Sequence, residues 1–160
     1  MANAHLATYL NDHLSGSVAA LELLERLEGA HAGTDLALAL AGLRAGIEAD
    51  RQDLERLMRQ QQIGASLPRQ AAAWLAEKST QVKLRLDDPS DGALRLLESL
   101  EMVALGLDGK RALWDALAAA DVPPPDGRDY QQLARRGAEQ RAQIERLRLA
   151  AAQTALRDAG

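Results

Sequence analysis

The sequence predicts an all-α fold, a bundle of four long amphipathic helices. Three observations favour this class. Apolar residues recur at steps of three and four along four long stretches, and runs of β-branched residues typical of strands are missing. Glycine- and proline-rich segments separate the stretches. At 160 residues the chain is expected to form a single domain over residues 1–160, which is long enough to bury a core.

The first two predicted helices cover residues 4–28 and 35–63. Asn3 and Thr34 are suited to cap their N-termini, since a short polar side chain accepts a hydrogen bond from the first helical turn. Gly29, followed by Gly33, is expected to end the first helix and Gly64 the second. The connection between the helices is short, so we expect an antiparallel hairpin.

Residues 65–89 differ from the other stretches. They contain a short helical segment after Pro68, and the sequence DDPSDG at residues 87–92 breaks it. Such a segment is too long for a hairpin turn and too short for a full bundle helix, so we expect a helical crossover from one end of the bundle to the other. Its Trp74 and leucines are expected to cover the outside of the bundle, or else to form an apolar patch for a partner.

The last two helices are predicted at residues 90–120 and 129–157, separated by the proline-rich stop DVPPPDG. Gly106 and Gly109 fall within the first of these, which favours a bend or a close helix contact there. A crossover between the second and third helices makes those two helices parallel. This is the one-crossover topology, as opposed to a bundle that alternates in direction at every helix.

Composition narrows the function classes. There are 23 acidic side chains against 19 Lys and Arg, and the only aromatic residues are two Trp and two Tyr. An acidic chain with few rings has little to attract or stack nucleic acid, so no nucleic-acid partner is expected. Cysteine is absent, which excludes disulfides and thiolate chemistry. No signal peptide or membrane span is seen, and we expect a cytoplasmic protein.

The last helix carries six arginines but only two glutamates. One interpretation is a solvated basic face that complements the acidic second half of the first helix. The other is a basic surface for an anionic partner. The frequent use of alanine and arginine is typical of a bacterial protein from a GC-rich genome.

Polar residues interrupt or border the apolar stripe of every predicted helix. They are His13 on the first helix, Asp50 on the second, Glu98 and Glu101 on the third, and Gln140 on the fourth. Burying an isolated charge is costly, so a layer made of these residues must pair internally or bind something. One interpretation is a buried polar layer neutralised by nearby arginines. The candidate arginines are Arg44, Arg51, Arg95 and Arg141.

The alternative is a divergent site for iron or manganese built from His13, Asp50, Glu98 and Glu101. A standard di-iron bundle places Glu on two helices and Glu-x-x-His on the other two. This chain lacks the two Glu-x-x-His motifs that such a site requires: one occurs, at Glu28–His31, where the first helix is expected to end. It also has no glycine-rich phosphate loop and no nucleophile elbow. The primary expectation is therefore no cofactor, no metal and no catalytic residue.

Two segments, YLNDHLSGS at residues 9–17 and LEMVALGLDGKRALW at residues 100–114, resemble bacterial members of the ferritin-like superfamily, as do the helix and connection lengths. The resemblance extends over nearly the whole chain and implies a ferritin-like four-helix bundle without the di-iron motif. We expect a non-enzymatic structural or protein-interaction module that forms a homodimer. The alternatives are a divergent metal-dependent oxidase, storage or stress protein, and a small-ligand carrier with a pocket between its helices.

Overall fold

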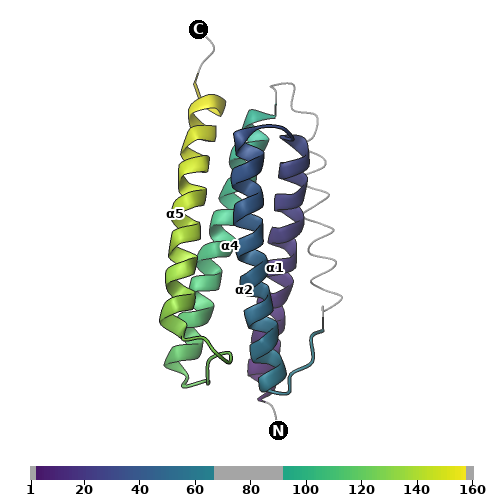
Figure 1. Cartoon of the computed structure of the whole chain (residues 1–160), viewed down its shortest axis with the longest axis vertical. Coiled ribbons are helices and arrows are strands. Elements are labelled where there is room, and N and C mark those ends of the chain that lie inside the picture. Colours follow the sequence, from purple (N-terminus) through teal and green to yellow (C-terminus); the bar gives the residue numbers. More distant parts are fainter. Residues whose placement is uncertain (1–2, 67–91, 158–160) are drawn as a thin grey trace.

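The computed structural model describes residues 3–66 and 92–157, and this part of the chain forms four long helices (Figure 1). They are α1 (Ala4–Ala30), α2 (Asp35–Gln60), α4 (Ala93–Ala119) and α5 (Tyr130–Ala155). No strand occurs in these residues, which confirms the all-α class. None of the helices described carries an apolar stretch sufficient to cross a membrane.

The four helices pack side by side around a shared core, with α1 against α2 and α4, and α5 against α4 and α2. One buried apolar cluster joins the second half of α1, the first half of α2, the first half of α4 and the second half of α5. A second cluster joins the opposite halves. Representative members are Leu24, Leu43, Leu100 and Ile144 in the first cluster, and Leu10, Leu57, Trp114 and Leu133 in the second.

These clusters define the directions of the helices. Each cluster combines matching halves of α2 and α4, so these two helices run in the same direction, while α1 and α5 run the opposite way (Figure 1). The antiparallel hairpin of α1 and α2 is thereby confirmed. The predicted crossover at residues 65–89 lies almost entirely outside the described residues, and it stays a prediction.

Side-chain caps begin three of the four helices. Asn3, Thr34 and Asp129 each accept a hydrogen bond from a backbone N–H two or three residues further on, at 2.9, 3.2 and 2.8 Å. The caps predicted at Asn3 and Thr34 are therefore present. α1 continues past the predicted stop at Gly29 and ends at Ala30. The glycine with the left-handed conformation is Gly33, in the turn that follows, with φ of 82°.

α2 and α4 both end with a non-glycine residue in the left-handed conformation. These residues are Gln62, with φ of 56°, and Asp121, with φ of 52°. At each end the following residue, Ile63 or Val122, donates its N–H to a carbonyl five residues back, as in a Schellman motif. The turn places Ile63 in the second cluster, and α2 therefore ends before the predicted stop at Gly64.

Candidate functional site

Asp50 lies in the middle of α2, at a position where the apolar stripe predicts an apolar core residue, and it is only 2% exposed. Gln140 of α5 donates a hydrogen bond from Nε2 to Asp50 Oδ2 at 2.9 Å. Lys110 of α4 donates from Nζ to the same Asp50 oxygen and to Gln140 Oε1. Arg136 of α5 forms an ion pair with the other oxygen, Oδ1. The buried acid is therefore held by two cations and one amide.

Asp53 lies one turn further along α2 and is 1% exposed. Arg136 reaches it at 2.6 Å, Arg56 at 2.7 Å and Arg128 at 3.2 Å. Arg136 thus bridges both acids, and it joins the two groups into one network. We call the following residues the ion-pair network: Asp50, Asp53, Lys110, Arg136 and Gln140.

Two of the residues predicted for a buried polar layer belong to this network. Asp50 and Gln140 are buried and hydrogen-bonded to each other. His13 is half-buried and lines a neighbouring cavity. The interpretation of Asp50 as a neutralised structural acid agrees with the contacts.

Glu101 does not belong to a buried layer, because it is exposed and pairs with Arg148 of α5 at 3.4 Å. The prediction was wrong for this residue. Glu98 is half-buried, and it precedes Lys110 by 12 positions, which corresponds to roughly 18 Å along a helix. α4 is apolar over most of its circumference, so the spacing of its residues does not identify its inner face.

The four predicted metal ligands therefore do not converge. Within residues 3–66 and 92–157, no group of three or more His, Asp or Glu side chains is placed to hold a metal ion. Asp50 is engaged by Lys110 and Arg136 instead. The geometry gives no support to an iron or manganese site at His13, Asp50, Glu98 and Glu101.

Most of the arginines expected to neutralise the layer pair elsewhere. Arg44 pairs with Glu28 of α1, and Arg51 pairs within α2 at 2.8 and 3.0 Å. Arg141 pairs with Asp108 of α4 at 3.3 Å. The cations that hold Asp50 come from α4 and α5, because these two helices face the inner side of α2 at this level.

Lys110, Asp53 and Arg136 were not anticipated from the sequence. A signal existed for Lys110, which lies three residues after Leu107 and four before Trp114 and therefore shares their face. It interrupts the stripe of α4 as Asp50 interrupts that of α2. Asp53 likewise lies on the inner face of α2, three residues after Asp50. Nothing in the spacing distinguishes Arg136 from the other arginines of α5.

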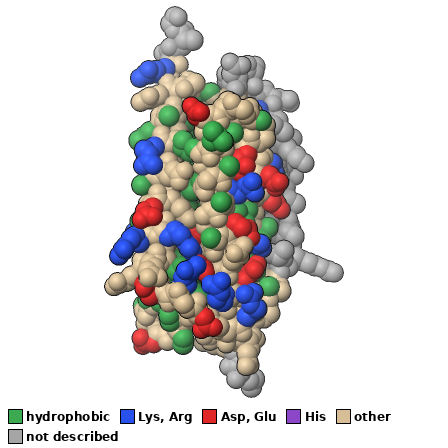
Figure 2. Space-filling model, in the orientation of Figure 1, with side chains coloured by type: hydrophobic (Ala, Val, Ile, Leu, Met, Phe, Trp, Pro, Cys, Tyr) green, Lys and Arg blue, Asp and Glu red, His purple; other side chains and the backbone are tan. Residues whose placement is uncertain are grey.

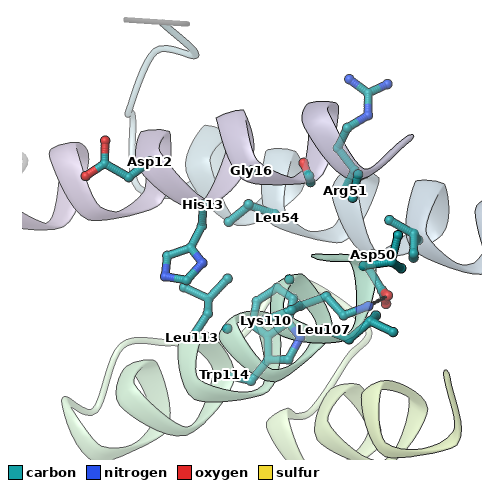
Figure 3. Close-up of a pocket in the computed structure, with 16 residues that line it drawn as sticks. Asp12, His13, Gly16, Asp50, Arg51, Leu54, Leu107, Lys110, Leu113 and Trp114 are labelled. Atoms are coloured by element: carbon teal, nitrogen blue, oxygen red, sulfur yellow. Dashed lines mark hydrogen bonds and ion pairs between the residues drawn. The ribbon is translucent and has the colours of Figure 1, made fainter. Parts of the chain in front are cut away.

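A cavity of about 180 Å³ lies between α1, α2 and α4, beside the ion-pair network (Figure 3). Most of its wall is apolar, and Leu54, Leu107 and Leu113 contribute to it. Figure 3 shows the ring of His13 directed from α1 toward Leu113, and the chain of Lys110 extending toward Asp50. The cavity is therefore mainly apolar, with His13 at one side and Lys110 at another.

Three glycines, Gly16 of α1 and Gly106 and Gly109 of α4, line this cavity. A Cβ added to any of them would have no atom outside its own helix within 4 Å. The expected close contact at Gly106 and Gly109 is therefore not present, and α4 continues through both without interruption. The missing side chains leave space between the helices.

Burial changes the proton affinity of both polar groups of the cavity. Desolvation lowers the pKa of His13 below its ordinary 6.5, and the charge of Asp12 partly offsets this. Burial also lowers the pKa of Lys110, against the opposing attraction of Asp50. The ring of His13 meets Tyr9 edge-on, with centroids 4.7 Å apart. Its surroundings therefore favour a neutral imidazole.

We expect His13 to make the protein less stable in mild acid. Because folding lowers its pKa, the unfolded chain binds more protons below pH 6.5, and stability falls as the pH drops through the folded value. His13→Gln should flatten the dependence of Tm on pH between about pH 5 and 7. His5→Gln, at an exposed position, is the control. Parallel acid profiles for wild type and His13→Gln would contradict this assignment.

Gly46 allows the close approach of Gln140 to α2. A Cβ at Gly46 would lie 2.9 Å from Gln140 Nε2, whereas one at Gly42 would meet nothing within 4 Å. Replacing a helical glycine by alanine normally stabilises by about 0.5–1 kcal/mol. We expect this gain for Gly42→Ala. Gly46→Ala should lose it, because the new methyl group displaces Gln140 from Asp50. Urea unfolding compares the two variants, and equal gains would show that Gln140 is not held tightly.

Comparison of the chain with models of protein families, with curated proteins and with solved structures found no match. These comparisons therefore neither support nor contradict the ferritin-like resemblance. The cavity and the charged groups around it are the features of the structure that bear on function.

Proposed function

We propose that this protein is a non-enzymatic binding module that holds a small, largely apolar molecule in the cavity between α1, α2 and α4. The supporting observation is the cavity itself, about 180 Å³ with mostly apolar walls. An engineered apolar cavity of about 150 Å³ accommodates benzene, so a molecule with a single ring is the right size. His13 offers a hydrogen-bonding group to such a ligand at one side of the cavity.

The contacts of the ion-pair network support a structural role for its polar groups. A catalytic base must reach a proton of the substrate, but the Asp50 carboxylate is already engaged by Lys110 and Arg136. Buried polar groups of this kind hold helices in one register. Here they connect the middle of α2 to α4 and α5.

The wider proposal is a ferritin-like bundle of one-crossover topology in the bacterial cytoplasm, with residues 65–89 as the crossover. The common direction of α2 and α4 supports this topology, because an up-down-up-down bundle would make α2 antiparallel to the helix that follows it.

Filling the cavity provides the test. Gly106 lines the cavity and has open space for a side chain, and leucine improves helix propensity, so Gly106→Leu should fold but no longer bind. Gly42→Leu is the matched control, since Gly42 is also in open space but does not line the cavity. Benzene, phenol and indole are the probes, with calorimetry and Tm as readouts. We expect at least one probe to bind wild type and the control but not Gly106→Leu. Failure of all three to bind wild type, or equal binding by Gly106→Leu, would refute the proposal.

A second candidate function, self-association, is favoured by the outer face of α4. Leu94, Met102 and Leu105 all lie on this side of the helix, and Leu105 is 71% exposed. Exposed apolar residues grouped in this way are typical of interaction surfaces. We propose that they form a homodimer interface. Leu105→Glu should yield a monomer in analytical ultracentrifugation, while Leu38→Glu, at an exposed position of α2, should not. A monomeric wild type at high concentration would exclude the dimer.

A further inference from the structure

Three arginines from three segments meet at the surface between α2 and α5. Arg56 belongs to α2, Arg128 to the segment that joins α4 and α5, and Arg136 to α5. All three contact the buried carboxylate of Asp53, and their own side chains are 38, 42 and 28% exposed. Figure 2 shows Lys and Arg side chains gathered across the lower halves of α5 and α2 on the viewed face. We call Arg56, Arg128 and Arg136 the arginine cluster.

The cluster has more positive charge than its acids neutralise. Within residues 3–66 and 92–157, the ion pairs of the three arginines and Lys110 are with two carboxylates, those of Asp50 and Asp53. The cations in these contacts outnumber the carboxylates by two, although the chain as a whole has a net charge of -4. Structural neutralisation of the two acids does not require so many cations.

Neighbouring acids are engaged in other contacts. Asp126 accepts a hydrogen bond from Gln60 at 2.7 Å, and Asp129 caps α5 by accepting from the backbone N–H of Gln132 at 2.8 Å. Glu55 on α2 pairs with Arg51 at 3.0 Å. These contacts give each of the three carboxylates a partner outside the cluster.

The guanidinium groups retain donors beyond those that bind Asp53. Arg56 donates to Asp53 from Nη1, Arg128 from Nε and Arg136 from Nη2. A guanidinium carries five N–H donors, so each side chain has further N–H groups. The Nε of Arg136 is buried and has no hydrogen-bond partner in the described part of the chain. Asp53, being buried, orients the arginines from beneath while their outer edges face solvent.

We propose that Arg56, Arg128 and Arg136 form a binding site for the phosphate group of a small soluble molecule. Paired guanidinium donors match the oxygens of a phosphate group in geometry and in charge. None of the three arginines lines the cavity, although Arg136 contacts Asp50 in its wall. Variants at Arg56 and Arg128 leave that wall unchanged, so each proposal can fail without the other.

Titration with inorganic phosphate, in buffers matched with chloride for ionic strength, tests this proposal. Binding is followed by calorimetry and by the NMR signals of the arginine Nε–H groups. We expect saturable binding that weakens about tenfold or more in Arg56→Gln and in Arg128→Gln, because each variant loses a charge-assisted hydrogen bond. Arg56→Lys, which keeps the charge but not the fork of donors, should also bind more weakly.

The control is Arg148→Gln, which removes an arginine of the same helix that pairs with Glu145. Thermal unfolding establishes that each variant is folded. Gly106→Leu should bind phosphate as wild type does, which separates this site from the cavity. The proposal is overturned if phosphate has no effect beyond that of chloride, or if Arg148→Gln weakens binding as much as the cluster variants. It is also overturned if only vesicles containing phosphatidic acid bind, and soluble phosphate does not.

Discussion

Replacing Asp50 by alanine is expected to lower the free energy of unfolding by about 3–5 kcal/mol, the usual cost of breaking a buried ion pair from one side. The variant leaves Lys110, whose side chain is 13% exposed, without its carboxylate partner. Arg136 retains Asp53, so most of the loss arises from the lysine. Urea unfolding followed by far-UV circular dichroism measures the change.

Lys110→Met should cost less than Asp50→Ala. In this variant Asp50 still pairs with Arg136 and accepts a hydrogen bond from Gln140. The double variant Asp50→Leu/Lys110→Met should recover much of the lost stability, because an apolar pair of similar volume often replaces a buried ion pair without loss. The single variant Asp50→Leu completes the cycle. If the losses of Asp50→Leu and Lys110→Met simply add in the double variant, the side chains are not coupled and the network does not hold the helices together.

Trp114→Ala is the second change with a large expected effect, a loss of about 3–5 kcal/mol. Trp114 is 1% exposed in the cluster at the N-terminal end of α5, and its ring lies 6.2 Å from that of Tyr130. Its Nε1 is buried without a hydrogen-bond partner among the described residues. Trp114→Phe should therefore cost much less, because it keeps an aromatic ring in the core and removes a donor that makes no hydrogen bond.

The space left by Trp114→Ala adjoins the existing cavity, because Trp114 forms part of the cavity wall. Indole should bind there and raise the Tm of the variant, since a ligand that binds only the folded state stabilises it by mass action. Trp114→Phe, which leaves less space, should show a smaller rise. No rise for Trp114→Ala would indicate that the core collapses around the deletion. Differential scanning calorimetry is a suitable readout, because free indole absorbs strongly in the far ultraviolet and would obscure circular dichroism.

The sequence alone determined the features that depend on interactions within one helix or between adjacent helices. The period of the leucines predicted four helices, and the polar residues Asn3 and Thr34 marked two helix starts, because a cap acts within a single turn. The short connection predicted the antiparallel pairing of α1 and α2. The gaps in two stripes identified Asp50 and Gln140 as buried polar residues. These inferences need no knowledge of which helices become neighbours.

The tertiary structure decided the partners of those residues. Lys110 meets Asp50 across 60 residues of sequence, and helical periodicity contains no information about contacts at that separation. α4 shows why even burial was difficult to predict: its apolar residues nearly encircle it, so Glu101 seemed suited to the core and is exposed. Asp50 pairs with Arg136, whereas Arg51 pairs with Glu48. Packing decides this, because a long side chain pairs with the acid that its backbone position brings within reach. The cavity, too, depends on tertiary packing, because its wall combines residues of α1, α2 and α4.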